Sequence, residues 1–361
     1  MRVLYKVLLN LIIFSCFLLV CYVFQINNNY LSVAYKDGNN KTQLLFFQPI
    51  QTPLRNSSES IKLSENFNLI NIWLIFTKVK HKNSPLKFKL KTLISSLLRF
   101  SSMPLGLNVI SDEPSKLIAE DIINATSLAY NKQIQVLFYN IANVTEQLSD
   151  LIKTMQPFFT SSPGTYYSDA LFFISLGLHR IAPSNQKQAI MLDVDTMLKA
   201  DIALLYKEFQ NFRDDAIIGI APELTPVYQH ILYSYRSRNK NTHLGNPITK
   251  GGFPGVNSGV LLLPFHKLRS SKKYQQLLSE DVVWNLTKKY SFKGHLGDQD
   301  FYTLIGIEFP QLLHLIPCNW NRQLCEWWGF HGYKDVFHSF SFCEKPVMLY
   351  HGNCNTPIPR D

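Results

Sequence analysis

The sequence has few long apolar runs. A single segment of its 361 residues is apolar for long enough to cross a bilayer, which excludes a multi-span membrane protein. It has no internal repeat and no Gly-X-Gly-X-X-Gly motif, so a dinucleotide cofactor is not expected. Charged residues make up only 17% while aromatic residues reach 13%, a composition that excludes disorder throughout the chain. The net charge of +10 indicates an anionic partner, and nucleic acid, acidic lipid and a nucleotide diphosphate all fit it.

The apolar segment covers residues 7–26, and a helix of that length spans roughly the 30 Å hydrocarbon core. Arg2 and Lys6 precede it, which places the N-terminus in the cytosol by the positive-inside rule. A cleaved signal peptide is the alternative, although the run is longer than a signal-peptide core. The organisation expected is a cytosolic tail (1–6), a transmembrane anchor (7–26), an irregular luminal stem (27–68) and a luminal domain (69–361).

Four of the six cysteines lie close together near the C-terminus: Cys318, Cys325, Cys343 and Cys354. An even cluster in an oxidising compartment indicates two disulfides, and three pairings are open. A zinc site is the rival interpretation, but the spacing lacks the C-x2-C element that is usual for zinc.

Apolar runs alternate with helical periodicity from residue 69 onward. The first run is dense in β-branched and aromatic side chains, which is typical of a strand buried on both faces of a parallel sheet. The polar residues 223–255 are expected to form a long loop. The expected strands are 69–76, 106–110, 134–139, 189–192, 217–220 and 260–263, and the expected helices are 91–100, 113–130, 168–178 and 201–212. This alternation predicts an α/β fold with a mostly parallel central sheet flanked by helices.

Two Asp-X-Asp triplets are candidates for chemistry. Asp193 and Asp195 directly follow an expected strand, where both side chains project to one side and where ligands bind in open α/β sheets. Such a pair can hold a divalent cation that in turn binds diphosphate oxygens. Asp298 and Asp300 flank Gln299 in a glycine-containing segment. A capped helix start is the plain interpretation of that second triplet, and a ligand site is compatible with it.

Three further features add polar or aromatic groups. His351 follows an apolar run, and an imidazole that joined two carboxylates would favour manganese over magnesium or calcium. Asn257 and Ser258 precede an expected strand, either in a turn or in contact with a sugar. Trp327 lies inside the cysteine cluster, where it packs on a disulfide or stacks on a sugar face.

Taken together, these positions resemble glycosyltransferase family 8, the retaining enzymes that include glycogenin and bacterial galactosyltransferases. The family's helix, Leu/Ile-x-Pro and strand ending in Asp-x-Asp is similar to residues 178–196. Three further family motifs have counterparts: the Asn-Ser-Gly strand at Asn257-Ser258-Gly259, the Asp-Gln motif at Asp298-Gln299, and the closing histidine at His351. The resemblance implies a GT-A-type nucleotide-sugar transferase fold over roughly residues 70–361.

The resemblance also implies roles. Asp193, Asp195 and His351 would hold Mn2+, with Mg2+ as a substitute, and Asp298 and Gln299 would act at the anomeric carbon. The nucleotide-sugar would contact Phe76, Thr77, Lys78, Val194, Leu296 and Asn353, and the acceptor would contact Asn257, Ser258, Trp327 and Asn355. The family's closing lysine, which faces the diphosphate, would align with Pro357, so the group that replaces it is open, with amides near Asn353 and Asn355 as candidates.

The segment from Cys318 to the C-terminus narrows the resemblance to the xylosyltransferases of this family. It implies a UDP-xylose donor and α-1,3 transfer to xylose-glucose on serine of EGF-like repeats in Notch-type receptors. It also implies a single-pass type II protein of the endoplasmic reticulum, with the Golgi as the alternative. A homodimer is left open, and a luminal domain has no nucleic-acid partner. The rivals are a transferase of another UDP-sugar (glucose or galactose) and a sugar-binding luminal protein without activity.

Overall fold

The computed structural model describes residues 32–36, 42–46, 69–79, 84–160 and 169–359. The chain divides into two compact units, residues 1–66 and 67–361. In the first unit, β1 (Ser32–Lys36) pairs antiparallel with β2 (Thr42–Phe46), so part of the expected stem is regular where irregular chain was predicted. Within the described residues, no helix has the length and apolar character needed to span a membrane. The predicted anchor at 7–26 lies outside them.

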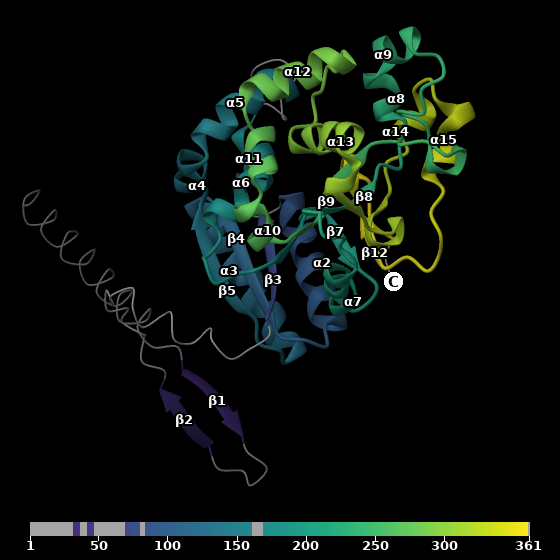
Figure 1. The fold of residues 1–361 in the computed structure, drawn as a ribbon. Helices are drawn as coiled ribbons and strands as arrows, with labels where there is room; N and C mark the ends of the chain where they lie inside the picture. Colours follow the sequence, from purple (N-terminus) through teal and green to yellow (C-terminus); the bar gives the residue numbers. More distant parts are fainter. Residues whose placement is uncertain (1–31, 37–41, 47–68, 80–83, 161–168, 360–361) are drawn as a thin grey trace, which may run out of the picture. The chain divides into compact units, whose positions relative to one another are not determined.

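A seven-stranded sheet forms the centre of the second unit (Figure 1). Its order is β10-β8-β9-β6-β3-β4-β5, and every neighbouring pair is parallel except those that involve β9. The strands are β3 (Ile70–Ile75), β4 (Leu105–Ser111), β5 (Gln135–Asn140), β6 (Ala189–Leu192), β8 (Ile218–Pro222), β9 (Val256–Leu263) and β10 (Leu313–Leu315). The prediction of a mostly parallel α/β sheet is confirmed.

Both faces of the sheet are buried. On β3, Ile72 and Leu74 belong to one apolar cluster and Trp73 to the other, as the period of two in a strand requires. The first cluster is covered by α2 (Pro85–Phe100), α3 (Glu113–Tyr130) and α7 (Ile202–Lys207). The second is covered by α4 (Ile141–Gln147), α5 (Ser149–Phe159), α6 (Ile174–Ile181), α10 (Phe265–Ser270), α11 (Lys272–Leu277), α12 (Glu280–Tyr290) and α13 (Asp298–Glu308).

Local signals explain several helix ends. Asp112 caps α3 by accepting from the Ser115 N–H, and Asn131 ends the helix in the left-handed conformation. Asp201 caps α7 as predicted, because its Oδ1 accepts from the Ala203 N–H at 2.9 Å. The helix predicted over 201–212 is shorter, since a 3-10 turn replaces it from Glu208.

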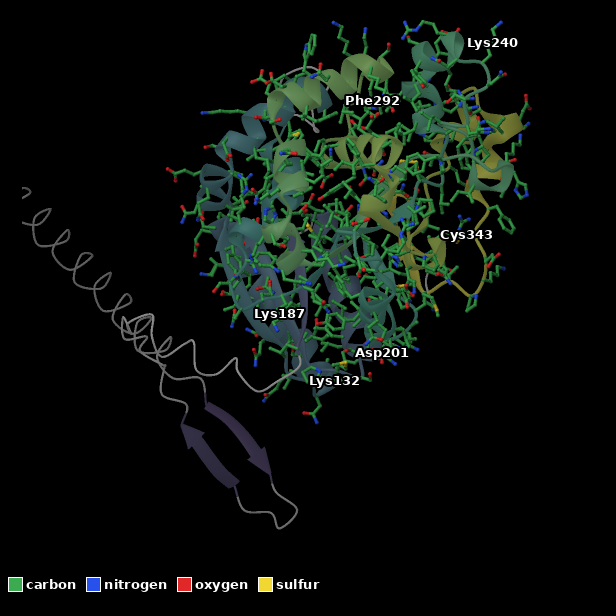
Figure 2. The ribbon with its side chains drawn as sticks, in the orientation of Figure 1. Lys132, Lys187, Asp201, Lys240, Phe292 and Cys343 are labelled. Atoms are coloured by element: carbon green, nitrogen blue, oxygen red, sulfur yellow. A yellow bond between two sulfur atoms is a disulfide. The ribbon has the colours of Figure 1, made fainter. Side chains whose placement is uncertain are left out.

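Two further side chains fix the turn between α2 and β4. Lys132 Nζ donates to the Ser101 carbonyl at 2.9 Å, and the Ser102 N–H donates to Asp201 Oδ1 at 3.3 Å. Lys132 and Asp201 lie at the same end of the domain, away from Phe292 (Figure 2). Burial opposes ionisation of Asp201, but the hydrogen bonds from Ser102 and Ala203 outweigh it and lower the pKa of this carboxyl.

The prediction of a loop over 223–255 is wrong. The segment forms α8 (Val227–Ile231), α9 (Tyr233–Arg238) and a 3-10 turn at Ile248–Lys250. Val227, Tyr228 and Ile231 are buried in the core, so three apolar side chains on one face hold the first of these helices in place. A helix of five residues is too short for its periodicity to stand out in the sequence.

A small second sheet brings the C-terminal region to the central sheet. Its strands are β7 (Thr196–Leu198), β11 (Arg322–Gln323) and β12 (Leu349–His351). β12 pairs antiparallel with β7, and His351 lies opposite Thr196, the residue after the first Asp-X-Asp triplet. Figure 1 shows β7 and β12 side by side.

Candidate active site

A cleft of about 830 Å³ opens at the end of the sheet where β6 and β8 finish. Its wall includes Asp193 and Asp195 after β6, Glu223 after β8, and Asp298 and Gln299 at the start of α13. The cleft has the size of a small-molecule site and the location typical of ligand sites in α/β sheets.

The first Asp-X-Asp triplet and His351 form one cluster in this cleft. His351 Nε2 lies 3.5 Å from Asp193 Oδ2 and 3.4 Å from Asp195 Oδ1, and one ligand atom from each residue lies within 4.8 Å of the others. These three side chains could hold a metal ion. The prediction that they come together is confirmed.

The ring of His351 is oriented from behind. Its Nδ1 lies 2.9 Å from Asn321 Oδ1, and the Asn321 amide donates to Asn257 Oδ1 at 2.9 Å. Because the Asn321 amide N–H is used on Asn257, its oxygen faces the imidazole and accepts from Nδ1. Nε2 is then the ring nitrogen that faces the two aspartates and would bind a metal ion, which is the arrangement of a metal-ligating histidine.

Gly259 in β9 makes room for that ring. A Cβ atom at this position would lie 2.2 Å from His351 Cε1 and 2.5 Å from Nδ1. The same glycine accepts the Asp193 N–H through its carbonyl at 2.9 Å. The glycine of the Asn-Ser-Gly segment is therefore required by the approach of His351.

The electrostatics of the cluster fit a cation. Burial lowers the pKa of His351, but hydrogen bonds and charge from Asp193 and Asp195 outweigh it and raise this pKa to about 10. Burial opposes ionisation of Asp195, yet His351 and Lys89 hold its pKa well below the ordinary range. Two carboxylates and an imidazole that favour a positive charge between them are a donor set for a divalent transition metal.

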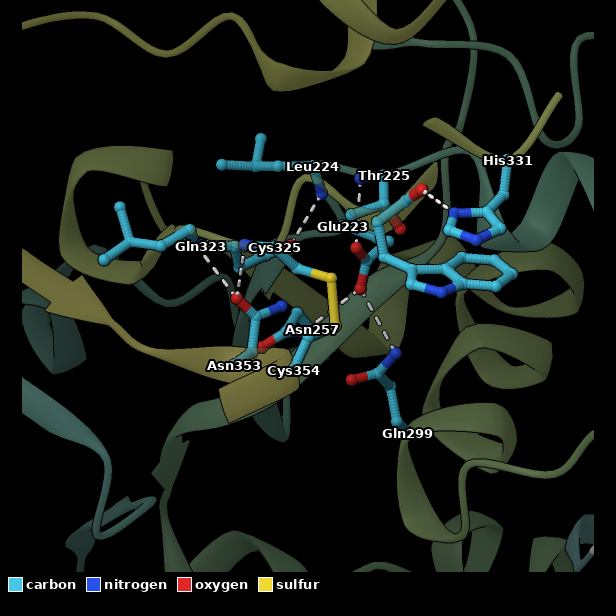
Figure 3. The surroundings of a disulfide bond; sticks show 12 residues. Glu223, Leu224, Thr225, Asn257, Gln299, Gln323, Cys325, His331, Asn353 and Cys354 are labelled. Carbon is cyan, nitrogen blue, oxygen red and sulfur yellow. Dashed lines mark hydrogen bonds between the residues drawn. A yellow bond between two sulfur atoms is a disulfide. The ribbon is translucent and has the colours of Figure 1, made fainter. Parts of the chain in front are cut away.

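A buried carboxyl group that the sequence analysis did not single out, Glu223, holds the amide side chains behind the cleft. Glu223 is 3% exposed, and its Oε2 accepts from Asn257 Nδ2 at 3.1 Å and from Gln299 Nε2 at 3.2 Å, while Oε1 accepts from the Thr225 N–H at 3.0 Å (Figure 3). Gln299 Oε1 accepts from the Ser258 N–H at 3.3 Å. The orientation of the Gln299 amide is thus set at both ends.

In the second triplet Gln299 and Asp300 are buried, and Asp298 is half-buried. Asp298 accepts from the hydroxyl groups of Ser175 and, at 3.0 Å, Ser258. Asp300 is 0% exposed and accepts from Tyr228 Oη at 3.0 Å. Burial raises the pKa of Asp298 and of Asp300 to about 7 in each case. The segment begins a helix, as the plain interpretation has it, and Asp298 also lines the cleft, so a ligand site here stays a prediction.

The four cysteines form two disulfides, Cys318–Cys343 and Cys325–Cys354, which excludes the zinc interpretation. Cys325–Cys354 lies in the cleft wall (Figure 3). Beside it, Asn353 Oδ1 accepts from the Leu324 and Cys325 N–H groups at 2.9 and 3.0 Å. The disulfide and this amide fix the C-terminal wall of the cleft.

An aromatic wall adjoins this disulfide. Trp327 is 50% exposed, and its ring stacks on His331 with 3.8 Å between centroids. Trp328 packs against Tyr333 and His230, and His230 lines the cleft together with both tryptophans. Exposed rings of this kind can stack on a sugar face.

Most residues predicted for the site line the cleft: Asp193, Val194, Asp195, Asn257, Ser258, Leu296, Asp298, Gln299, Trp327, His351, Asn353 and Asn355. Asn257 and Ser258 use their side chains inside the protein rather than leaving them free, since Asn257 bonds to Glu223 and Ser258 to Asp298. What each residue does there stays a prediction.

The structure does not bring Phe76, Thr77 and Lys78 into the cleft. Phe76 is 1% exposed in the core, the Thr77 hydroxyl donates to Asp112, and Lys78 pairs with Asp169. Ile75, the residue before them, lines the cleft, so the first strand does end at the site. The role of these three residues in nucleotide binding stays a prediction.

The fold and the cluster define a class of protein. A mostly parallel sheet with flanking helices, and an Asp-X-Asp triplet joined by a distant histidine at its edge, make this chain a glycosyltransferase with a GT-A-like fold. In a scan against protein-family models, none matches the chain.

Comparison with individual proteins identifies the family. The chain is 44% identical over 296 residues to mouse xyloside xylosyltransferase 1 and 43% identical to the human protein, in each case over 81% of this chain and 75% of the relative. It is similar to the crystal structure of the mouse protein in its apo form, with a TM-score of 0.76 over 80% of this chain and 99% of that one. The chain belongs to the xyloside xylosyltransferase family, and it is a xylosyltransferase.

Proposed function

We propose that this enzyme transfers xylose from UDP-xylose, with retention and in α-1,3 linkage, to a xylose-glucose glycan on serine of EGF-like repeats. The identity to named xyloside xylosyltransferases supports xylose as the sugar that is transferred and a xyloside as the acceptor, and the UDP group follows from the family resemblance. The linkage and the EGF-like repeat follow from the resemblance of the C-terminal segment, which here forms the wall of the cleft.

Asp193, Asp195 and His351 would hold the metal ion, for which we propose Mn2+. When bound, a divalent cation stabilises the negative charge that develops on the leaving diphosphate. Asn321 keeps the Nε2 atom of His351 directed at the carboxylates, and Gly259 gives the ring its space. Neither of these two residues lines the cleft, so each acts on the site through His351.

The hydrogen bonds of the carboxyl groups in the cleft wall support retention without a carboxylate nucleophile. Both oxygens of Glu223 and both oxygens of Asp298 already accept hydrogen bonds from the protein. Retaining glycosidases need a pair of carboxyl groups free to flank the glycosidic bond. We therefore propose departure of UDP and attack by the acceptor hydroxyl on the same face of the sugar, with Gln299 held in place to orient the anomeric centre.

A donor screen tests this proposal. Purified full-length protein is incubated with a xylose-glucose acceptor, Mn2+ and UDP-xylose, UDP-glucose or UDP-galactose, and UDP release and product are measured. We expect turnover with UDP-xylose, an α-anomeric product by NMR, and loss of turnover on chelation of the metal. Turnover with UDP-glucose or UDP-galactose alone would show that the donor is that sugar nucleotide and not UDP-xylose. Absence of turnover with all three would favour a sugar-binding role.

We also propose a type II anchor at residues 7–26 with the catalytic unit in the lumen of the endoplasmic reticulum. Support comes from the basic residues before the apolar run and from two disulfides, which persist in oxidising compartments. Protease protection in sealed microsomes tests the orientation: a catalytic unit digested without detergent would refute it.

A further inference from the structure

Lys89 on α2 reaches the edge of the metal cluster from a helix distant in sequence. Its Nζ lies 3.2 Å from Asp195 Oδ2 and 3.1 Å from Asn355 Oδ1. The side chain is 21% exposed, so most of its stem is buried while the ammonium group is in the cleft. Because the stem is packed and the ammonium group is hydrogen-bonded, this side chain has lost much of its rotamer freedom.

The charge around this group is one-sided. Among the described residues that line the cleft, Lys89 is the only lysine or arginine, against the carboxyl groups of Asp193, Asp195, Glu223 and Asp298. A metal ion in the Asp193–Asp195–His351 cluster offsets the first two carboxylates. A multiply charged diphosphate then brings more negative charge into the same space, and Lys89 is the fixed cation available to it.

The contacts of the Lys89 ammonium group leave one of its hydrogen-bond donors unused. Asp195 divides its oxygens, with Oδ1 facing His351 and Oδ2 facing Lys89, so the ammonium lies directly beside the metal cluster. An ammonium has three N–H donors, and the described contacts use two, on Asp195 and Asn355. The third donor is left for a ligand in the cleft.

We propose that Lys89 binds the diphosphate of the nucleotide-sugar, as the charge that supplements the metal ion. The inference rests on the proposed function in one respect, that the donor is a nucleoside diphosphate sugar. The alternative is that Lys89 only positions Asp195 for the metal. The two roles differ in what they do to metal binding: a positioning residue strengthens it, whereas a neighbouring cation does not.

The test is the variant Lys89→Met, which keeps the length of the apolar stem and removes the charge. Lys91→Met is the matched control, because Lys91 is an exposed lysine on the same helix and does not line the cleft. For full-length wild-type and variant proteins, the Kd of Mn2+ alone is measured by calorimetry. The Kd values of uridine, UMP and UDP are then measured at saturating Mn2+.

We expect Lys89→Met to raise the Kd of UDP by roughly 10- to 100-fold, the loss of a charge-assisted hydrogen bond, and to leave that of uridine unchanged. The Kd of Mn2+ alone should stay the same or fall, because a like charge has been removed. Lys89→Arg should recover part of the UDP affinity, and Lys91→Met should match wild type throughout.

Three results would overturn the inference. In the first, UDP affinity in Lys89→Met stays within about twofold of wild type. In the second, Mn2+ affinity falls as much as UDP affinity, which would assign Lys89 to positioning Asp195. In the third, wild-type protein with Mn2+ binds no UDP, which would refute the proposed donor together with the inference, whereas the first two leave the donor standing.

Discussion

Gly259→Ala is the sharpest perturbation that the site offers, because it adds a single methyl group where the metal-binding histidine packs. The new Cβ would lie 2.2, 2.5 and 2.9 Å from three ring atoms of His351. To reach an ordinary contact distance of roughly 3.5 Å, the ring must move by about 1 Å. Gly259 lies in β9 between β6 and β8, so the backbone cannot yield instead.

The expected loss of metal binding follows from the narrow range of ligand distances that a metal site tolerates. Ligand distances in such sites hold to about 0.2 Å, and the Nδ1 contact of His351 with Asn321 is 2.9 Å, so a displacement near 1 Å disrupts both. Loss of a supporting interaction of this kind weakens metal binding by roughly 10- to 100-fold. Overpacking also costs about 1–3 kcal/mol of stability.

The assay is Mn2+ titration of purified protein with a thermal melt in parallel. Gly106→Ala is the control, since it is the same change at the far end of β4, where the nearest atom, Asn71 Oδ1, is 3.3 Å away. If Gly259→Ala acts through the histidine, adding it to His351→Ala should weaken Mn2+ binding no further. Wild-type Mn2+ affinity in Gly259→Ala, with the fold intact, would refute the reasoning.

Three further predictions concern the metal, the buried carboxyls and a disulfide. Asp195→Asn should abolish UDP release from UDP-xylose with little change in melting temperature, because the residue is at the site and outside the apolar core. Burial raises the pKa of Asp300 to about 7, against 3.8 for an unperturbed aspartate, so the folded state holds the proton more tightly and the free energy of unfolding should fall as pH rises from about 4 to about 7. Asp298 has the same raised pKa, so Asp300→Asn should remove about half of that fall in denaturant titrations. Replacing Cys325 and Cys354 by serine should cost about 3–4 kcal/mol of stability and also weaken UDP binding, since Asn353 beside them shapes the cleft.

Each of these three predictions has a control variant or a result that would contradict it. Full activity of Asp195→Asn would show that the metal assignment is wrong. An unchanged pH slope in Asp300→Asn would show that this carboxyl is ionised in the folded protein. Cys318 and Cys343 close a loop of similar length and do not line the cleft. Replacing them by serine should therefore lower stability as much as replacing Cys325 and Cys354 and leave UDP affinity unchanged. Equal effects of both disulfides on UDP affinity would contradict a local role.

The elements that could be predicted are those whose signal is contained in their own residues. The strand over 189–192 and the helix over 113–130 have the predicted bounds, because a dense apolar run and a long amphipathic period with Asp112 before it are local patterns. α8 could not be predicted, since five residues are too few to display a period. The cap at Asp201 is predictable and the end of its helix is not, because the 3-10 turn that follows has no composition of its own.

The candidate site divides in the same way. Asp193, Asp195 and His351 could be named because carboxylates and a histidine directly follow apolar runs. Lys89 and Asn321 could not, since a lysine among several others near α2 and an asparagine in an irregular segment have no distinguishing neighbours. Glu223 carries a weaker signal: it lies three residues after the strand expected over 217–220, and it directly follows the strand as observed.

The sequence by itself determined the chemistry that is available: two carboxylates after a buried strand, a distant histidine, an Asp-Gln pair and four clustered cysteines, in the order of a glycosyltransferase. Only the tertiary structure decided which of these groups meet. β12 returns to β7 and places His351 against Asp193, α2 carries Lys89 to the same edge, and the disulfides take one of three pairings. The physical reason is that a side chain's type is written at its own position, whereas its distance to a partner far along the chain is set by the packing of every element between them.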